Sequence, residues 1–266
     1  MYNTRTNDLS WNSRILEAFD LSEEMLPRLC PAYQSPGRLQ QELVSLTGLK
    51  KQPPVLIGGN DAVLAAYSVN IDNPGEVFNI NGTCEITMVC LDECRPSQNY
   101  NIRAHVVPER WFSFYVMNAG GKAFEWFKGL FCSEMDNETF FNDFVPAAVE
   151  AWIDRESGVS YTPYLMGSRY SLKPLKAEFL GLTQETSREE LLAALIRGLC
   201  EYQRQHLQEI GEAVSLDSEI IVSGGLISAP IIRAKKRWMR DCTYLSEAES
   251  SMRGAAMLGK KYLQSL

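Results

Sequence analysis

The sequence lacks a long apolar run and an export signal. Its 266 residues include no stretch of roughly 18 consecutive apolar residues, the length of helix needed to cross a bilayer. The first residues lack the basic, apolar and cleavage regions of a signal peptide. With 45% hydrophobic and 22% charged residues, the chain can bury one large core or two small ones. We therefore expect a cytoplasmic protein that does not bind membranes.

Positive charge and metal-ligand spacing are also lacking. The formal net charge is -7, which argues against a surface that binds nucleic acid. A basic run at residues 233–237 is better explained as the solvated face of a helix. The seven cysteines form no C-x-x-C pair, and neither histidine lies at ligand spacing from them. These patterns favour reduced thiols over disulfides or a zinc site, so we expect no metal ligand from the protein.

The sequence does contain a carboxylate and a glycine turn in an informative order. Residues 55–59 form an apolar run that predicts a buried strand, and its two glycines lead to Asp61. Further on, residues 79–83 predict a hairpin with a threonine hydroxyl, between strands over residues 77–80 and 85–89. This order suits phosphoryl transfer, in which a carboxylate takes a hydroxyl proton while main-chain amides hold a phosphate. Tight turns use the same residue types, so a purely structural role stays open.

Two more glycine-bearing junctions follow apolar runs. Residues 118–121 precede a helix predicted over residues 122–130. Residues 219–225 form a β-branched strand that ends in a glycine pair, before Pro230 and a further helix. Glycine lets the backbone approach a ligand closely, and the amides of a helix N-terminus favour anions. Together with Asp61, these junctions indicate a nucleotide site.

Strands and helices alternate along the chain, which predicts an α/β fold. Ser187 and Glu190 form a capping box that opens a long helix, followed by a strand over residues 220–222. One face of that helix is apolar, with Leu191, Leu192, Leu195, Ile196 and Leu199 at helical spacing. Polar residues within the segment 133–163 predict a surface insertion.

Taken in order, these motifs resemble the C-terminal domain of the FGGY family of carbohydrate kinases over nearly the whole chain. The resemblance is carried by residues 4–8 with Trp11 (RTxxW), 58–61 (GGxD), 80–83 (the GT hairpin), 120–127 (GGxxxWF), 164–169 with 179–183 (PYLxGER and FxGLT), 222–225 (VSGGG), and 247 with 254–259 (E and GAAxLA). It implies one domain, residues 1–266, with a ribonuclease-H-like, actin-like ATPase fold in which helices flank a mixed sheet.

The resemblance also implies an activity, which is transfer of the γ-phosphate of ATP to a sugar or polyol hydroxyl, with Mg²⁺ bridging phosphate oxygens. In the family, an N-terminal domain of similar size carries most sugar contacts and a first phosphate hairpin. Met1 falls where the second domain should begin, so we expect the chain to be about half of the enzyme. We expect that half to be inactive alone, and it could form a homo-oligomer through its uncovered side.

Site residues follow from the resemblance position by position. Asp61 matches the catalytic base, which contacts the sugar and takes the proton of the attacking hydroxyl. The positions that match nucleotide-binding residues are Gly82 and Thr83 in the phosphate hairpin, Gly121 and Glu125 near the phosphates and ribose, and Gly224, Gly225 and Ala229 in the adenosine turn. Two structural alternatives stay open. In the first, Glu125 is an ordinary residue of a helix surface; in the second, the glycine pair serves only the turn from strand to helix.

Some positions depart from the family pattern. Ala62 stands where many members have Gln or His after the base, and Leu226 replaces a third glycine. Ala229 occupies a position often held by Asn or Ser that bonds the adenine. The identity of the sugar is therefore open. A non-catalytic nucleotide-binding or assembly module is the alternative function, while an ATPase for movement or chaperoning is disfavoured because residues 164–183 resemble sugar-kinase sequence.

Overall fold

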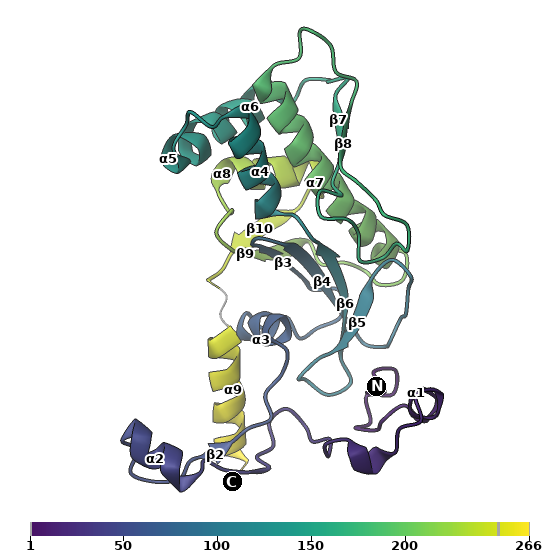
Figure 1. Ribbon diagram of the computed structural model, residues 1–266, viewed down its shortest axis with the longest axis vertical. Coiled ribbons are helices and arrows are strands. Elements are labelled where there is room, and N and C mark those ends of the chain that lie inside the picture. The colour runs from purple at the N-terminus through teal and green to yellow at the C-terminus, as the bar shows by residue number, and fades with distance from the viewer. Residues whose placement is uncertain (1, 249–250, 266) are drawn as a thin grey trace.

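The computed structural model describes residues 2–248 and 251–265; Met1, where we expected the second domain to begin, lies outside them. At its centre is a six-stranded mixed sheet with the strand order β10-β9-β3-β4-β6-β5 (Figure 1). The strands are β3 (Val77–Asn81), β4 (Glu85–Leu91), β5 (Asn101–Ala104), β6 (Trp111–Met117), β9 (Glu219–Ser223) and β10 (Thr243–Ser246). β3, β4, β6 and β5 pair antiparallel, whereas β9 runs parallel to β3 and to β10. The predicted hairpin is confirmed, because Asn81 pairs with Glu85 across a three-residue loop.

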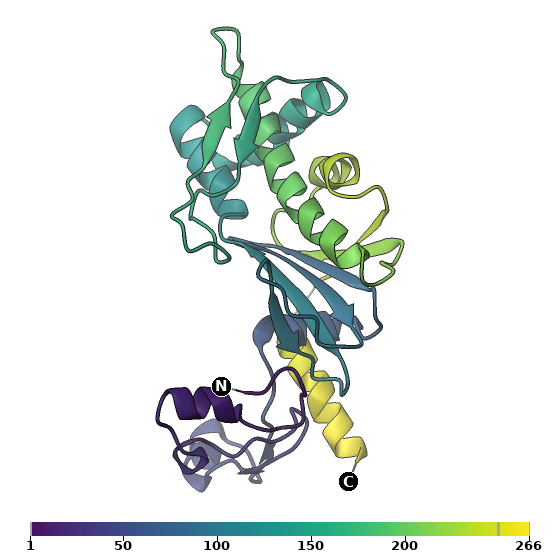
Figure 2. The same cartoon turned by 90° about the vertical axis from the view of Figure 1, so that its right-hand side faces the viewer.

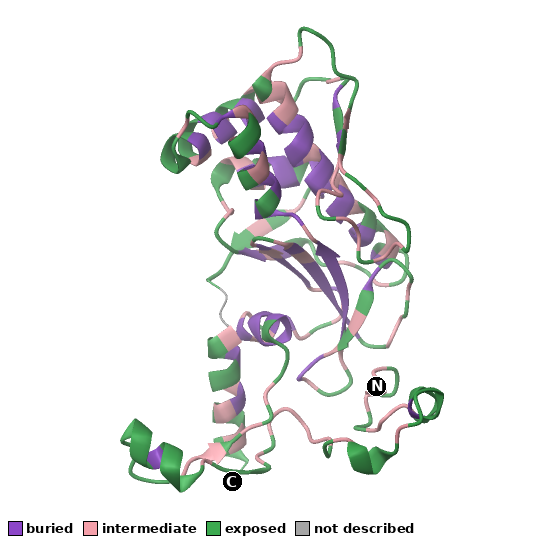
Figure 3. Ribbon diagram, in the orientation of Figure 1, coloured by how far each residue is buried: buried purple, intermediate pink, exposed green. Residues whose placement is uncertain are grey.

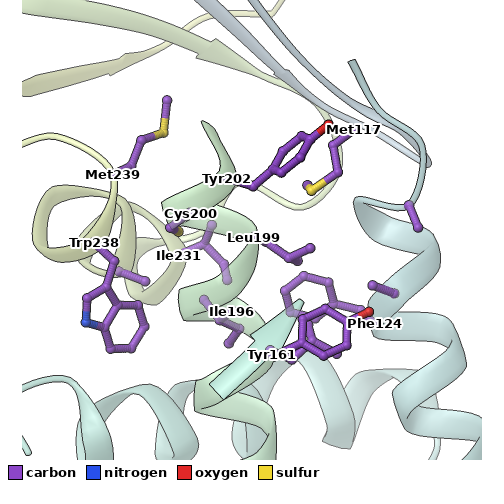
Figure 4. Close-up of a cluster of buried hydrophobic side chains, with 14 of the residues drawn as sticks. Met117, Phe124, Tyr161, Ile196, Leu199, Cys200, Tyr202, Ile231, Trp238 and Met239 are labelled. Atoms are coloured by element: carbon purple, nitrogen blue, oxygen red, sulfur yellow. The ribbon is translucent and has the colours of Figure 1, made fainter. Parts of the chain in front are cut away.

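Four helices lie on one side of the sheet (Figure 1). These are α4 (Gly121–Phe131), α6 (Val145–Trp152), α7 (Arg188–Gly211) and α8 (Ala229–Trp238). Of these, α6 packs on α7 and α8 and not on the sheet itself. Half of the predicted capping box is present at the start of α7: the Ser187 side chain accepts a hydrogen bond from the Glu190 amide, whereas the Glu190 carboxylate accepts one from Ser157 Oγ. The apolar face of α7 packs into the main core, with Ile196, Leu199 and Tyr202 close to Trp238 of α8 and Met117 of β6 (Figure 4).

The opposite face of the sheet is covered by α3 (Asp61–Ser68), against which α9 (Ser251–Gln264) packs (Figure 1). Ala62, Val63 and Ala66 of α3 are buried against Phe78 and Phe112 of the sheet. The prediction of an α/β fold with a mixed sheet flanked by helices is therefore confirmed. Within residues 2–248 and 251–265, every helix is too short or too polar to cross a bilayer.

The chain before α3 lies beside α9 and beyond the end of the sheet, which it contacts where Trp111 Nε1 of β6 donates a 2.7 Å hydrogen bond to the Thr4 carbonyl (Figure 2). Its elements are α1 (Ser13–Ala18), η1 (Glu23–Met25), β1 (Gly37–Arg38), α2 (Gln41–Thr47) and β2 (Pro54–Val55). Most of this segment is exposed, in contrast to the buried central sheet and α7 (Figure 3).

The prediction of a buried strand over residues 55–59 is wrong. Only β2 forms there, it pairs with β1 rather than with the sheet, and the side chains of Val55 and Ile57 are 44% and 48% exposed. The amides of Ile57 and Gly58 bond to the carbonyls of Gln34 and Ala32 instead. An apolar composition predicted a core strand, but the tertiary partner of this segment is another loop.

The prediction of a surface insertion over residues 133–163 is also wrong. The segment forms α5 (Asn137–Thr139), the π-helical turn η2 (Phe140–Phe144), α6 and β7 (Ser160–Thr162), which pairs with β8 (Glu178–Leu180). Phe140 and Ala148 are fully buried in the main core, and Tyr161 is 5% exposed. Asp136 caps α5 and residues 154–158 form a loop, while Phe140 and Phe144 between them are buried in the core.

The interpretation of the basic run 233–237 is wrong at one residue. Arg233, Lys236 and Arg237 are exposed, as predicted, but Lys235 is 1% exposed and forms an ion pair with Glu85 of β4. The spacing of Ile231, Ala234, Lys235 and Trp238 places all four on the buried face of α8.

Candidate active site

Two cavities meet at the loop between β3 and β4, residues 82–84. The α3 cavity has a volume of about 380 Å³ and is lined by Asn60, Asp61, Ala62, Ala65, Ile80, Cys84, Ile86, Arg103, Phe114, Val116, Arg169 and Ser251. The α4 cavity has a volume of about 370 Å³ and is lined by Asn81, Gly82, Thr83, Gly121, Glu125, Lys128, Gly129, Asn137, Phe141, Gly225 and Leu226. Consecutive strand residues point to opposite faces of a sheet, so Ile80 and Asn81 face different cavities. The loop contributes to both, and both are large enough for a small molecule.

Asp61 is the first residue of α3, directly after the N-cap residue Asn60. Its side chain is exposed on the α3 cavity, and its Oδ1 accepts a hydrogen bond of 2.8 Å from the Ala62 amide. Because α3 is packed on the sheet, Asp61 is a hydrogen-bond acceptor on a fixed element that faces the cavity.

Two arginines line the same cavity as Asp61. Arg169 Nε donates a 2.6 Å hydrogen bond to Asn118 Oδ1, which fixes the guanidinium near the end of β6. The guanidinium of Arg103 lies 5.4 Å from the centre of the Phe114 ring. The motif around Arg169 drew attention to that residue, but no sequence signal marked Arg103, which belongs to the edge strand β5.

Five of the seven predicted nucleotide-binding residues line the α4 cavity: Gly82, Thr83, Gly121, Glu125 and Gly225. The structure brings these together from β3–β4, α4 and the β9–α8 turn. Gly224 and Ala229 do not line it. Gly224 lies within the turn, and Ala229 is the exposed first residue of α8.

Gly224 and Gly121 have a packing role on the 82–84 loop. Gly224 has a φ of 106°, and a Cβ atom there would overlap the carbonyl oxygen of Asn81. A Cβ atom on Gly121 would come within 2.9 Å of the Gly82 carbonyl oxygen. Both glycines therefore let a neighbouring turn approach the loop more closely than any other residue would.

The main-chain amides at the start of α4 are not free to bind an anion, because they bond to the loop. The amides of Gly120 and Lys122 donate to the Thr83 carbonyl, and the Gly121 amide donates to the Gly82 carbonyl at 2.8 Å. The N-terminus of α4 is thus satisfied by the loop, contrary to the expectation that its amides would face a ligand. In the part of the chain that the structure describes, the amides of Thr83 and Cys84 have no partner. Unpaired amides at a turn are suited to bind phosphate oxygens.

Sequence reasoning missed the buried polar residues beneath this loop. Lys235 Nζ lies 2.6 Å from Glu85 Oε1, and Asn79 Nδ2 donates to the same oxygen at 3.0 Å. Asn79 lies in the predicted hairpin and Lys235 in the basic run, but no sequence pattern marked either of them, or Glu85, as buried. The signal that could have found Lys235 is its position on the apolar face of α8.

Comparison with known proteins decides the family. The model of the C-terminal domain of the FGGY family of carbohydrate kinases matches residues 77–260, and the model of the N-terminal domain matches residues 1–68. The chain belongs to the FGGY family of carbohydrate kinases. The resemblance seen in the sequence is thereby confirmed. That residues 1–266 form the C-terminal domain alone stays a prediction.

Relatives within the family are distant in sequence and similar in fold. A xylulose kinase of Staphylococcus xylosus is 23% identical over 224 residues, which cover 82% of this chain and 45% of that protein. A gluconokinase of Bacillus licheniformis is 25% identical over 207 residues, covering 75% of this chain and 40% of that protein. The crystal structure of a ligand-bound xylulose kinase from Lactobacillus acidophilus superimposes with a TM-score of 0.85 at 19% identity, covering 97% of this chain and 53% of that one. The chain spans about half the length of these relatives.

Proposed function

We propose that this FGGY chain contributes the catalytic base and the nucleotide site of an ATP-dependent carbohydrate kinase. The observation that carries the proposal is the position of the 82–84 loop, which borders both cavities and has Asp61 across one of them. A phosphate held at the loop would lie between a nucleotide in the α4 cavity and an acceptor in the α3 cavity. This is the arrangement that in-line phosphoryl transfer needs.

Asp61 acts as the general base in this proposal. Its carboxylate takes the proton from a hydroxyl of the acceptor as that oxygen attacks the γ-phosphorus, and the bond from phosphorus to the bridging oxygen of ADP breaks. A positioned general base typically contributes about 10²–10⁴-fold to rate. The two arginines of the α3 cavity, Arg103 and Arg169, donate hydrogen bonds to other oxygens of the sugar or polyol that receives the phosphate.

The α4 cavity holds the nucleotide. The amides of Thr83 and Cys84, which have no partner among the described residues, bind phosphate oxygens at the loop, while Gly121, Glu125 and Gly225 line the space for the ribose and adenine. We include Gly224 and Ala229 as the turn that shapes this space. Among the described residues no cluster of three or more His, Cys, Asp or Glu could hold a metal ion, so we propose that Mg²⁺ enters with the phosphate oxygens and offsets their charge.

The acceptor is a sugar or polyol, as the names of the xylulose kinase and gluconokinase relatives suggest. The lining of the α3 cavity offers one carboxylate and two guanidinium groups, which can bind hydroxyl groups or an acidic sugar. Xylulose and gluconate are therefore the first two acceptors to assay.

The test is a reconstituted enzyme, in which this chain is co-expressed with the remaining half of the S. xylosus xylulose kinase. We expect sugar-dependent release of ADP from the reconstituted enzyme and none from the 266-residue chain alone, because phosphoryl transfer depends on positioning by both sides of the site. Asp61→Asn should lower kcat by about 10²–10⁴-fold and leave ADP affinity unchanged. Asp143→Asn is the matched control, because Asp143 is an exposed residue of η2. Near-normal kcat in Asp61→Asn would remove that residue from the mechanism, and nucleotide binding without transfer to any acceptor would favour the non-catalytic module.

A further inference from the structure

A chain of buried polar side chains connects α8 to the α4 cavity. Lys235 Nζ donates to Glu85 Oε1 at 2.6 Å, and Asn79 Nδ2 donates to the same oxygen at 3.0 Å. Asn81 Nδ2 in turn donates to Asn79 Oδ1 at 2.9 Å. The exposed fractions of Lys235, Glu85, Asn79 and Asn81 are 1%, 6%, 0% and 3%. The last member, Asn81, lines the α4 cavity.

The two ends of the 82–84 loop belong to this chain. Asn81 is the last residue of β3 and Glu85 is the first residue of β4, so both residues that flank the loop are held by the same side-chain network. Asn81 also contacts the β9–α8 turn, because its Nδ2 donates to the Ser223 carbonyl at 3.4 Å and its carbonyl accepts from the Leu226 amide at 3.4 Å. The network therefore joins two of the backbone segments that line the cavity.

Fold stability alone is a weak reason to bury this ion pair. Removing two charges from water costs more than their attraction often returns, and apolar residues of similar volume can replace such a pair without loss of stability. The ion pair does restrict the geometry of the site. Because Lys235 is held on α8, it fixes where the Glu85 carboxylate can lie, and it thereby fixes the start of β4. An ion pair that restricts geometry beside the proposed phosphate-binding loop points to a role in positioning that loop.

We propose that Glu85 and Lys235 are positioning residues that hold the 82–84 loop in its nucleotide-binding conformation. They act through Asn79 and Asn81, and they do not touch the nucleotide. The ligand whose binding they support is an adenine nucleotide bound through its phosphates. This inference rests on the proposed function for the choice of ligand, whereas the effect on the loop is independent of it.

The variant that separates positioning from stability is Glu85→Leu/Lys235→Met. Each single substitution would leave a buried charge without a partner, which would report on folding instead. The double variant removes both charges and keeps apolar volume, so its thermal midpoint should stay close to that of the native chain. Leu195→Ala, fully buried in α7, is the control for a general loss of stability.

The first readout is amide hydrogen exchange at Gly120 and Gly121, measured without nucleotide. These amides donate to the loop carbonyls of Thr83 and Gly82, so their protection reports the loop conformation. We expect exchange at both to accelerate about tenfold in the double variant, while amides in the middle of α7 keep their native rates. Leu195→Ala should show the opposite distribution, with acceleration in α7.

The second readout is the Kd for ADP by calorimetry, which should rise about tenfold in the double variant and stay unchanged in Leu195→Ala. The variant Glu85→Gln/Lys235→Met keeps a hydrogen-bond acceptor for Asn79, so it should give a smaller change in both readouts. If Glu85→Leu/Lys235→Met does not fold, the same two measurements on Glu85→Gln/Lys235→Met test the positioning role. Native exchange rates at Gly120 and Gly121 in the folded double variants would overturn the inference. If the native chain does not bind ADP, the proposed nucleotide site fails, while the exchange measurement still decides whether the ion pair positions the loop.

Discussion

Gly254 of α9 lies directly against the main-chain carbonyl of Leu64 in α3. A Cβ atom at position 254 would overlap that oxygen, so the two helices can pack at this distance only with glycine there. The contact matters for the site because α3 begins with Asp61. α9 is therefore part of what fixes the proposed base.

Substitution at this contact should destabilise the chain. Gly254→Ala must push α9 away from α3, and overpacking of this kind typically costs about 1–3 kcal/mol. Gly259→Ala is the matched control on the same helix, because no atom lies within 4 Å of its added Cβ; it should stabilise α9 by about 0.5–1 kcal/mol. Urea denaturation of both variants measures the difference. Equal free energies of unfolding for the two variants would show that the α3–α9 contact accommodates the added methyl group without loss of stability.

His206 should make the chain less stable in mild acid. Burial lowers the pKa of His206 from 6.5 to about 3. As the pH falls below 6.5, His206 becomes protonated in the unfolded chain but stays neutral in the folded chain until the pH nears 3. The free energy of unfolding therefore decreases as the pH falls from 6.5 to about 3. The expected slope is about 1.4 kcal/mol per pH unit.

The matched variant for this prediction is His206→Phe. It keeps the stacking that His206 makes with Tyr115, whose ring lies 4.6 Å away, and removes the titrating group. The free energy of unfolding, measured from neutral pH to about pH 4.5, should fall less steeply in the variant. Parallel curves for the two proteins would show that His206 does not set the acid sensitivity.

The segment before α3 should promote self-association. Phe19, Met25 and Leu46 are 71%, 68% and 75% exposed, and exposed apolar groups of this size commonly form contacts. Phe19→Ser/Leu46→Ser should reduce the concentration dependence of light scattering, and Leu172→Ser, at an exposed position elsewhere, should not. A native chain that stays monomeric at high concentration would contradict this expectation.

Local patterns predicted the elements that are fixed by their own sequence. The β3–β4 hairpin, the capped start of α7 and the strand-to-helix step from β9 to α8 formed as expected, because turn chemistry and periodicity act over a few residues. The order of the motifs also predicted that Gly82, Gly121 and Gly225 would converge. They do so at the α4 cavity.

Contacts made across the fold could not be predicted in this way. Residues 55–59 have the composition of a core strand, yet their amides pair with the loop at residues 32–34. The position of Lys235 on the apolar face of α8 indicates burial, but its partner, Glu85, lies 150 positions away and no local pattern marks that pairing. The amides of Gly120 and Gly121 are not available to a ligand because they bond to the loop, and no local sequence pattern predicts that pairing.

The central claim is that the 82–84 loop binds the phosphates of a nucleotide beside Asp61. Titration of the isotope-labelled 266-residue chain with ADP, followed by amide NMR shifts, tests it most directly. We expect saturable shifts at Thr83, Cys84 and Gly225, unchanged in Asp61→Asn, with no shift at residues around the buried His206. Absence of shifts at the loop at high ADP concentration, or shifts confined to another part of the chain, would contradict it.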